Sequence, residues 1–96
     1  MVEYLLSLEA QQSLKEIKSF SIRNFGEQRA KIYLGDILTR FRELAANPLL
    51  GKVRNELKEG YYSSFVGSHT IYYRTNSSLI EIIDVLHQSM EPKRHL

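Results

Sequence analysis

The chain has 96 residues, which is enough for one domain with a modest hydrophobic core. A hydrophobic fraction of 43% and a charged fraction of 25% are typical of a folded globular protein and exclude an intrinsically disordered chain. The thirteen basic and eleven acidic residues are interspersed, so the net charge of +2 forms no cationic strip, and we expect no direct sequence-specific binding of nucleic acid.

The first quarter of the chain predicts a strand followed by a helix. Residues 2–6 are mostly apolar or aromatic, which is typical of a short strand. Ser7 can then cap a helix, because its hydroxyl can accept a hydrogen bond from a free amide of the first turn. The apolar face of this helix is predicted to consist of Ala10, Leu14, Ile17 and Ser21. The helical pattern is interrupted at Phe25-Gly26.

A second helix is predicted over residues 27–46, because apolar side chains recur there at spacings of three and four residues. These side chains are Ala30, Tyr33, Leu34, Ile37, Leu38, Phe41, Leu44 and Ala45. The helix ends at Asn47-Pro48, since a residue before proline avoids helical geometry. We interpret Gly35 as a small residue that lets the first helix or a sheet approach closely. The two helices are expected to form an antiparallel hairpin that turns one apolar face to a sheet.

The second half predicts three strands, at residues 61–66, 70–75 and 79–86, joined by turns at 67–68 and 76–78. Such short turns indicate an antiparallel meander, and residues 91–96 form a tail. The predicted fold is therefore one α+β domain with the order β-α-α-β-β-β, in which a helical hairpin packs on a mostly antiparallel sheet.

Several classes of site are not supported by the residues. The chain has no cysteine, and its three histidines lack the spacing of metal ligands, so we expect neither a metal nor a cofactor. No serine-nucleophile motif occurs. The start of the chain lacks the features of a signal peptide, and no apolar run reaches membrane-spanning length, so we expect a cytoplasmic protein that does not enter a membrane.

Several short motifs follow one another over nearly the whole chain. They are Phe25-Gly26, Asn47-Pro48-Leu49-Leu50-Gly51, Arg54-Asn55-Glu56-Leu57, Gly60-Tyr61, Gly67-Ser68-His69, Ile71-Tyr72-Tyr73-Arg74 and Val85-Leu86-His87-Gln88-Ser89-Met90-Glu91. In this order the chain resembles the ParE toxins of the ParE/RelE superfamily of type II toxin–antitoxin systems. The resemblance implies a toxin that binds and poisons DNA gyrase without being an enzyme, and that a cognate antitoxin holds inactive. It leaves open whether the chain forms a homodimer or a hetero-oligomer with the antitoxin.

The main alternative is a ribosome-dependent messenger RNA endonuclease, because RelE-like relatives of this fold cut RNA. Such a reaction needs cations and an acid–base pair on one face of the sheet. The candidates are Arg54, Glu56, Lys58, Arg74 and His87. Arg54 and Glu56 are expected to form a surface ion pair instead. For His87 two roles stay open, a general acid or base, or the favoured role of bonding a backbone carbonyl and fixing the tail.

Two residues depart from positions where the superfamily often carries arginine. Tyr62 and Asp84 each remove a positive charge from the place where a phosphate would lie, and Asp84 would repel it. These departures disfavour a nuclease and leave open a weakly toxic homologue that chiefly binds an antitoxin. The residues expected to contact the target are Arg74, His87, Met90, Lys93 and Arg94. Outward-facing aromatic residues, taken to be Tyr61, Tyr62 and Phe65, are expected to contact the antitoxin.

Overall fold

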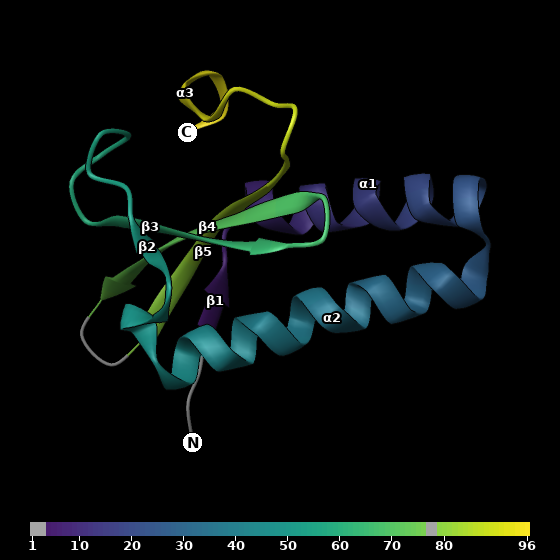
Figure 1. Cartoon of the computed structure of the whole chain (residues 1–96), viewed down its shortest axis with the longest axis horizontal. Coiled ribbons are helices and arrows are strands. Elements are labelled where there is room, and N and C mark those ends of the chain that lie inside the picture. The colour runs from purple at the N-terminus through teal and green to yellow at the C-terminus, as the bar shows by residue number, and fades with distance from the viewer. Residues whose placement is uncertain (1–3, 77–78) are drawn as a thin grey trace.

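The computed structural model describes residues 4–76 and 79–96 and has an α+β architecture (Figure 1). The long helices are α1 (Leu8–Phe25) and α2 (Glu27–Ala46). The strands are β1 (Tyr4–Leu6), β2 (Lys52–Val53), β3 (Tyr61–Val66), β4 (His69–Asn76) and β5 (Leu79–His87). Two short helices are also present: the 3₁₀ helix η1 (Pro48–Leu50), which follows α2, and α3 (Pro92–His95), which follows β5.

One sheet contains all five strands in the order β1-β5-β4-β3-β2. β1 pairs with β5 in parallel, and the other three pairings are antiparallel. The predicted helical hairpin and the meander of β3, β4 and β5 are confirmed, with α1 and α2 covering one face of the sheet (Figure 1). Residues 2 and 3 of the predicted first strand and residues 77 and 78 of the predicted turn lie outside the described residues.

Ser7 joins the first helix to the sheet. Its hydroxyl accepts a hydrogen bond from the Ala10 amide at 2.9 Å, which confirms the predicted cap, and donates to the carbonyl of Ile83 at 2.6 Å. Ile83 lies in an irregularity of the β4–β5 ladder, where Tyr72 pairs with Asp84 but Tyr73 pairs with Ile82. The serine hydroxyl thus satisfies a carbonyl at the bulge, where the regular ladder is interrupted.

The core lies between α2 and the sheet. Ile37, Phe41 and Leu44 of α2 are fully buried, as the helical spacing predicts. Leu38 was predicted to share this stripe, but this was wrong, because it is 37% exposed at the edge of the helix face. The interpretation of Gly35 was also wrong, since a Cβ atom built there would meet nothing within 4 Å.

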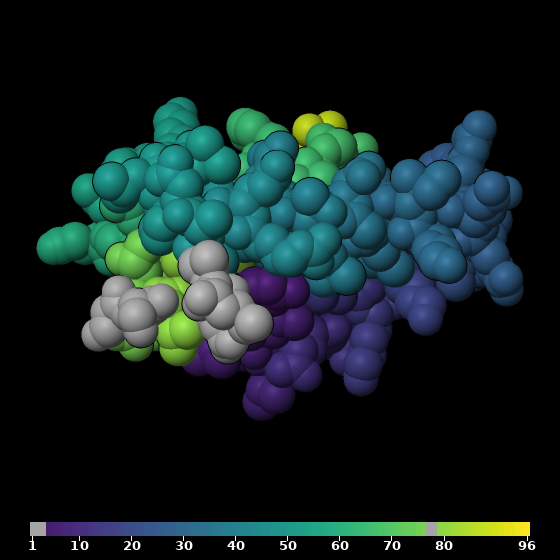
Figure 2. Space-filling view, turned by 90° about the horizontal axis from the view of Figure 1, so that it is seen from below, coloured from purple at the N-terminus to yellow at the C-terminus, as the bar shows by residue number. Residues whose placement is uncertain are grey.

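Two elements escaped the sequence patterns. β2 has only two residues, too few for an alternating pattern, and α3 is a single turn inside the predicted tail, started by Pro92 at a position that suits proline. The tail runs on the side of the sheet away from α2, and its Met90 lines a cavity with residues of α1 (Figure 1). Figure 2 shows the hairpin side, where α2 runs along most of the molecule and only a small part of the tail is visible beyond it.

Candidate functional site

The face of the sheet that turns away from the helices carries cations considered for catalysis, Arg54, Lys58 and Arg74, and the structure pairs the two arginines with carboxylates. Arg54 Nε lies 2.7 Å from Glu56 Oε2, which confirms the predicted ion pair, and the Arg54 guanidinium also lies 5.6 Å from the ring centroid of Tyr72. Arg74 Nε lies 2.7 Å from Glu81 Oε1 across the β4–β5 pair. We call this surface the outer face.

A mixed set of charges surrounds a cavity of about 320 Å³ on the outer face. Its lining includes Lys58, Tyr61, Arg74 and Asp84, together with His95 of α3. The tail therefore lies against the part of the sheet where an RNA substrate would have to approach the cations.

Asp84 has a structural partner. Its Oδ1 atom accepts hydrogen bonds from the Ser13 hydroxyl at 2.6 Å and from the Val85 amide at 2.8 Å. The carboxylate is buried and links β5 to α1. One oxygen of this carboxylate is thus used to join β5 to α1, while the residue also lines the cavity on the outer face.

The predicted target contacts do not form one cluster. Arg74 is ion-paired with Glu81 on the outer face. His87 lies at the end of β5, where its Nδ1 atom hydrogen-bonds Ser89 and not a backbone carbonyl as expected. Met90 lies beside α1, and Lys93 and Arg94 are exposed on α3. The predicted contacts are therefore distributed over the outer face, the end of β5, the side of α1 and the helix α3.

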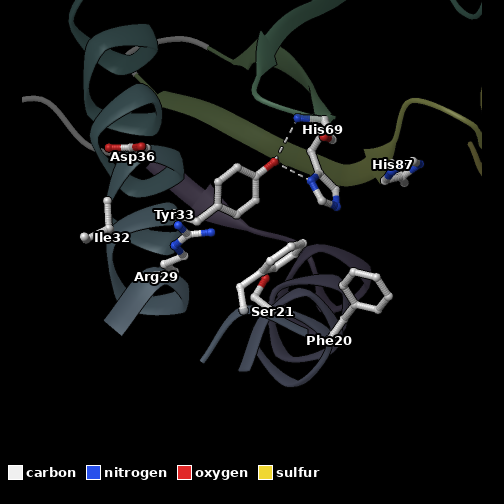
Figure 3. Close-up of a pocket in the computed structure, with 10 residues that line it drawn as sticks. Phe20, Ser21, Arg29, Ile32, Tyr33, Asp36, His69 and His87 are labelled. Carbon is white, nitrogen blue, oxygen red and sulfur yellow. Dashed lines mark hydrogen bonds between the residues drawn. The ribbon is translucent and has the colours of Figure 1, made fainter. Parts of the chain in front are cut away.

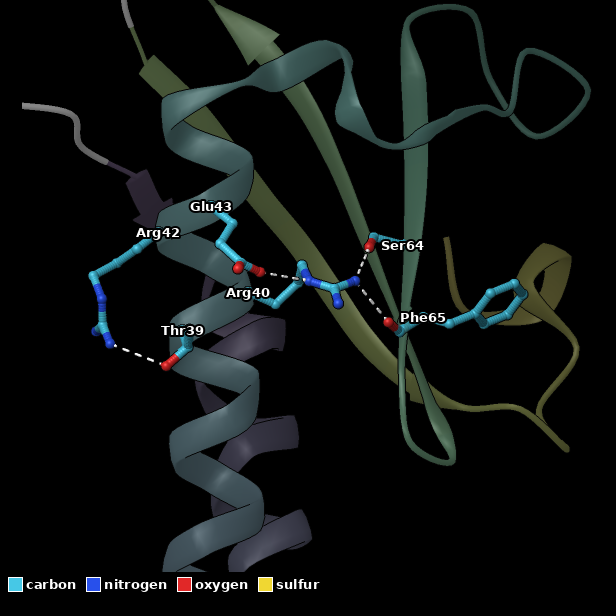
Figure 4. A network of polar contacts seen from close by, with 6 residues as sticks. All are labelled: Thr39, Arg40, Arg42, Glu43, Ser64 and Phe65. Carbon is cyan, nitrogen blue, oxygen red and sulfur yellow. Dashed lines mark hydrogen bonds and ion pairs between the residues drawn. The ribbon is translucent and has the colours of Figure 1, made fainter.

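Of the three aromatic residues expected to bind an antitoxin, only Phe65 stands exposed, at 65%. Tyr61 is buried, and Tyr62 stacks on Tyr73 with ring centroids 5.4 Å apart. Figure 4 shows how β3 is held beside Phe65: Arg40 of α2 donates from Nη1 to Ser64 Oγ at 2.7 Å and to the Phe65 carbonyl at 2.9 Å. The backbone of this segment is fixed while the Phe65 ring points away from α2 (Figure 4).

A larger cavity, of about 530 Å³, lies between the helical hairpin and the β3–β4 turn (Figure 3). Tyr33 of α2 reaches this turn: its hydroxyl donates to the Val66 carbonyl at 3.0 Å and accepts from the Ser68 amide at 3.1 Å. Gly67 fits beneath the ring, because its φ of 56° suits glycine and an added Cβ would lie 2.6 Å from Tyr33 Cε1.

Two histidines belong to the hydrogen-bond network of this cavity. The Tyr33 hydroxyl, which bonds the Val66 carbonyl, also lies 2.6 Å from His69 Nδ1, and the tautomer of His69 decides which of these two groups donates to the other. The Nδ1 atom of His87 accepts from the Ser89 amide at 3.1 Å, so in neutral His87 the proton is on Nε2. The rings of His69 and His87 meet edge to face with centroids 5.3 Å apart.

Burial affects both polar partners in the cavity. Burial, reinforced by the charge of His87, lowers the pKa of His69 below its ordinary value of 6.5, which favours the neutral imidazole. Burial likewise raises the pKa of Tyr33 above 10.0, so its hydroxyl remains protonated at neutral pH. The sequence did not predict this cluster of Tyr33 and His69. Its patterns place Tyr33 in the apolar stripe of a helix and His69 next to a turn.

Two further properties concern the described residues alone. No helix within residues 4–76 and 79–96 is both long and apolar enough to cross a membrane. Within the same ranges, no three histidine or acidic side chains come together as metal ligands would.

Comparison with known families decides the kinship of the chain. Residues 4–92 match the family model described as the ParE toxin of type II toxin–antitoxin systems, parDE. The chain belongs to the ParE toxin family. It is 38% identical over 94 residues to Toxin ParE1 of Mycobacterium tuberculosis, covering 97% of this chain and 96% of the relative. It is 34% identical over 96 residues to Toxin ParE1 of Caulobacter vibrioides, covering 100% and 99%.

Solved structures share the fold of this ParE family toxin at low sequence identity. A chromosomal ParDE system from P. aeruginosa has a TM-score of 0.78 at 17% identity, covering 91% of this chain and 96% of that one. The RelBE2 toxin–antitoxin complex of Mycobacterium tuberculosis has a TM-score of 0.65 at 22% identity, covering 90% and 96%. A heterotetrameric YoeB-YefM toxin–antitoxin complex from Staphylococcus aureus has a TM-score of 0.62 at 18% identity, covering 91% and 97%. At these identities the likeness concerns the fold only.

Proposed function

We propose that this toxin of a type II toxin–antitoxin system acts in the cytoplasm by binding and inhibiting DNA gyrase, and that it is not an enzyme. The observation that carries the proposal is the pairing of Arg54 with Glu56 and of Arg74 with Glu81 on the outer face. A ribonuclease on this face would need cations available to the pentavalent phosphate, and a carboxylate at 2.7 Å competes with the phosphate for each guanidinium.

The target surface in this proposal is the tail. Lys93 and Arg94 are exposed on α3 and present positive charge away from the packed faces of α1 and α2. Exposed charges of this kind speed the encounter with a complementary surface and help to choose the partner. His87 and Met90 precede α3 at the base of the tail, while the engaged Arg74 contributes less.

A cognate antitoxin is the second proposed partner, in a hetero-oligomer. The similar RelBE2 and YoeB-YefM structures are themselves toxin–antitoxin complexes, which supports a protein antitoxin here. Phe65 is the accessible aromatic anchor on the sheet, next to backbone that Arg40 holds in place. An antitoxin contact with Tyr61 or Tyr62 stays a prediction.

A supercoiling assay tests the proposed target. Purified toxin, gyrase and relaxed plasmid should give less supercoiled DNA or more linear DNA on an agarose gel, and added antitoxin should restore supercoiling. Charge reversal of Lys93 and Arg94 should weaken inhibition, whereas reversal of the exposed Lys18 on α1 serves as the matched control. If gyrase is unaffected while messenger RNA is truncated on translating ribosomes, the endonuclease alternative is correct.

A further inference from the structure

The turn at residues 88–90 connects β5 to the tail, and a histidine ring takes part in it. His87 is the last residue of β5, and its Nδ1 atom accepts a hydrogen bond from the Ser89 amide at 3.1 Å. The Ser89 hydroxyl lies 2.7 Å from the same nitrogen. The Gln88 amide donates to the Ser68 carbonyl at 2.8 Å, which fixes the turn to the end of the β3–β4 pair.

Little else fixes the tail in the described part of the chain. The backbone hydrogen bonds that the structure shows for residues 91–96 run within the tail, from the Arg94 amide to the Glu91 carbonyl and from the Leu96 amide to the Pro92 carbonyl. α3 has no buried residue, and its basic side chains are exposed. The position of the tail therefore depends on the turn that precedes it.

Protonation of the His87 ring is incompatible with the bond to the Ser89 amide. A neutral imidazole accepts at one nitrogen and donates from the other, but an imidazolium donates from both. Once Nδ1 carries a proton, that proton and the Ser89 N–H point at each other, and Nδ1 can bond only the Ser89 hydroxyl. Because histidine is the side chain that ordinarily changes charge between about pH 5 and 8, this turn is sensitive to mild acid.

A second histidine lies opposite the first. His69 is the direct partner of His87 in the β4–β5 ladder, and Figure 3 shows it between Tyr33 and His87. Protonation of His69 leaves its own hydrogen bond possible, since an imidazolium can donate from Nδ1 to the Tyr33 hydroxyl oxygen, 2.6 Å away. Acid therefore breaks a hydrogen bond at His87 and adds only charge at His69. Like charges on directly opposed residues destabilise a strand pair.

The groups around the two histidines offer little compensation for this charge. From α2, the described cavity lining includes Asp36, the cation Arg29 and the titratable Tyr33. From α1, the lining residues are uncharged: Phe20, Ser21 and Phe25. The charged α1 residues that line the adjacent cavity with Met90 are Lys15, Glu16 and Arg23. In both cavities the cations at least match the carboxylates, so a doubly protonated pair meets no net negative charge.

We propose that His87 is an acid-sensitive switch for the tail: the neutral ring holds the turn after β5, and its protonation beside His69 releases residues 88–96 from the sheet. This inference deepens the proposed function and rests on it for its consequence, because the tail is the proposed target surface. A released tail no longer holds Lys93 and Arg94 at a fixed place, so acid weakens inhibition of the target while the domain stays folded.

The switch is tested on the intact chain by NMR relaxation, from about pH 7.5 down to the pH at which the His87 ring signal shows a charged imidazole. The backbone order parameters of Ser89 and Met90 should fall from about 0.85, typical of a rigid backbone, to below about 0.6. Those of β4 and β5 should stay near about 0.85, which separates release of the tail from unfolding. If Ser89 and Met90 remain rigid when the His87 ring is charged, the switch is refuted.

Three variants locate the titrating group. His87→Gln keeps an acceptor for the Ser89 amide but cannot be protonated, so the tail should stay ordered at both pH values. His87→Arg has a permanent charge and no acceptor, so the tail should be mobile at both. His95→Gln removes a different histidine, exposed on α3, and should keep the response of the wild type. A pH response that persists in His87→Gln, or disappears in His95→Gln, overturns the assignment to His87.

Supercoiling assays near neutral pH separate this inference from the proposed function. His87→Arg and His87→Gln both lack the imidazole, so a lost ring contact affects them equally. If the ordered tail is populated at about a tenth in His87→Arg, that variant should require about tenfold more protein than His87→Gln for the same inhibition of gyrase. Equal inhibition by the two variants overturns the regulation of the target. If the tail responds to pH but the wild type leaves gyrase unaffected, the proposed target fails and the switch stands.

Discussion

Gly51 and Gly35 provide a matched test of the packing, because the same substitution should have opposite effects at the two positions. Gly51 follows η1 and lies against Tyr73, whose hydroxyl accepts from the Gly51 amide at 2.9 Å and donates to the Pro48 carbonyl at 2.8 Å. The backbone of Gly51 is extended, with φ of −77°, so conformation alone would allow alanine. What excludes alanine is space.

A Cβ atom at Gly51 would lie 2.8 Å from the Ser63 carbonyl oxygen and 2.9 Å from Tyr73 Cε1, and it would also collide with the Tyr73 hydroxyl. Tyr73 is fully buried and stacked on Tyr62, so its ring cannot move aside without disturbing the core. Forcing extra atoms into a packed site usually costs about 1–3 kcal/mol. Displacement of the hydroxyl would add the cost of an unpaired amide or carbonyl, about 1–3 kcal/mol.

We therefore expect Gly51→Ala to lower the free energy of unfolding by about 2–4 kcal/mol in a urea titration followed by circular dichroism. Gly35→Ala should raise it by up to about 1 kcal/mol, because Gly35 is a helical residue with open space around its Cα atom. If Gly51→Ala unfolds within about 0.5 kcal/mol of the wild type, the contact between Gly51 and Tyr73 is not a packing constraint.

Three further predictions concern the core, the cavity and the tail. Phe41→Ala should destabilise by about 3–5 kcal/mol in the same titration, since the ring is fully buried, and a loss below about 1 kcal/mol would mean an exposed helix face. Because the pKa of His69 is lowered in the folded protein, its contribution to stability is complete above pH 6.5 and is lost as the pH falls through the lowered pKa. His69→Gln should therefore flatten the dependence of the free energy of unfolding on pH in this acidic range. An unchanged pH dependence would refute the lowered pKa of His69. Deleting residues 91–96 should preserve antitoxin binding but weaken gyrase inhibition; unchanged inhibition contradicts a target role, and a lowered melting temperature indicates that the tail stabilises the sheet.

The helices and the three long strands could be predicted because their signals are local. The spacing from Ala30 to Ala45 and the cap at Ser7 each depend on residues within a few positions, and both appear in the structure. The predictions for Leu38 and Gly35 were wrong for a different reason. The packing of the helix in the fold, and not the periodicity of the sequence, decides how wide its buried stripe is. The parallel pairing of β1 with β5 joins the two ends of the chain and has no local signal.

The candidate sites were harder to predict, since they depend on which side chain each residue meets. Arg54 and Glu56 are two positions apart, and their ion pair could be foreseen. Asp84 was read as a charge facing a phosphate, but its oxygen bonds Ser13, a residue 71 positions away. A departure from a family pattern therefore shows that a charge has changed, and only the packed structure shows what it now contacts.

Three hydroxyl groups account for much of what periodicity cannot foresee. Ser7 satisfies the carbonyl of Ile83 at a bulge 76 positions away, and Tyr73 joins the two ends of the η1 turn. Tyr33 does the same at the β3–β4 turn and, in doing so, orients His69. A hydrophobic pattern records each of these residues only as apolar or polar. Their structural role, however, depends on the backbone group to which each hydroxyl forms a hydrogen bond. A residue that the sequence assigns to the core can thus be the one that shapes a cavity, because one end of tyrosine packs while its hydroxyl fixes a neighbouring ring.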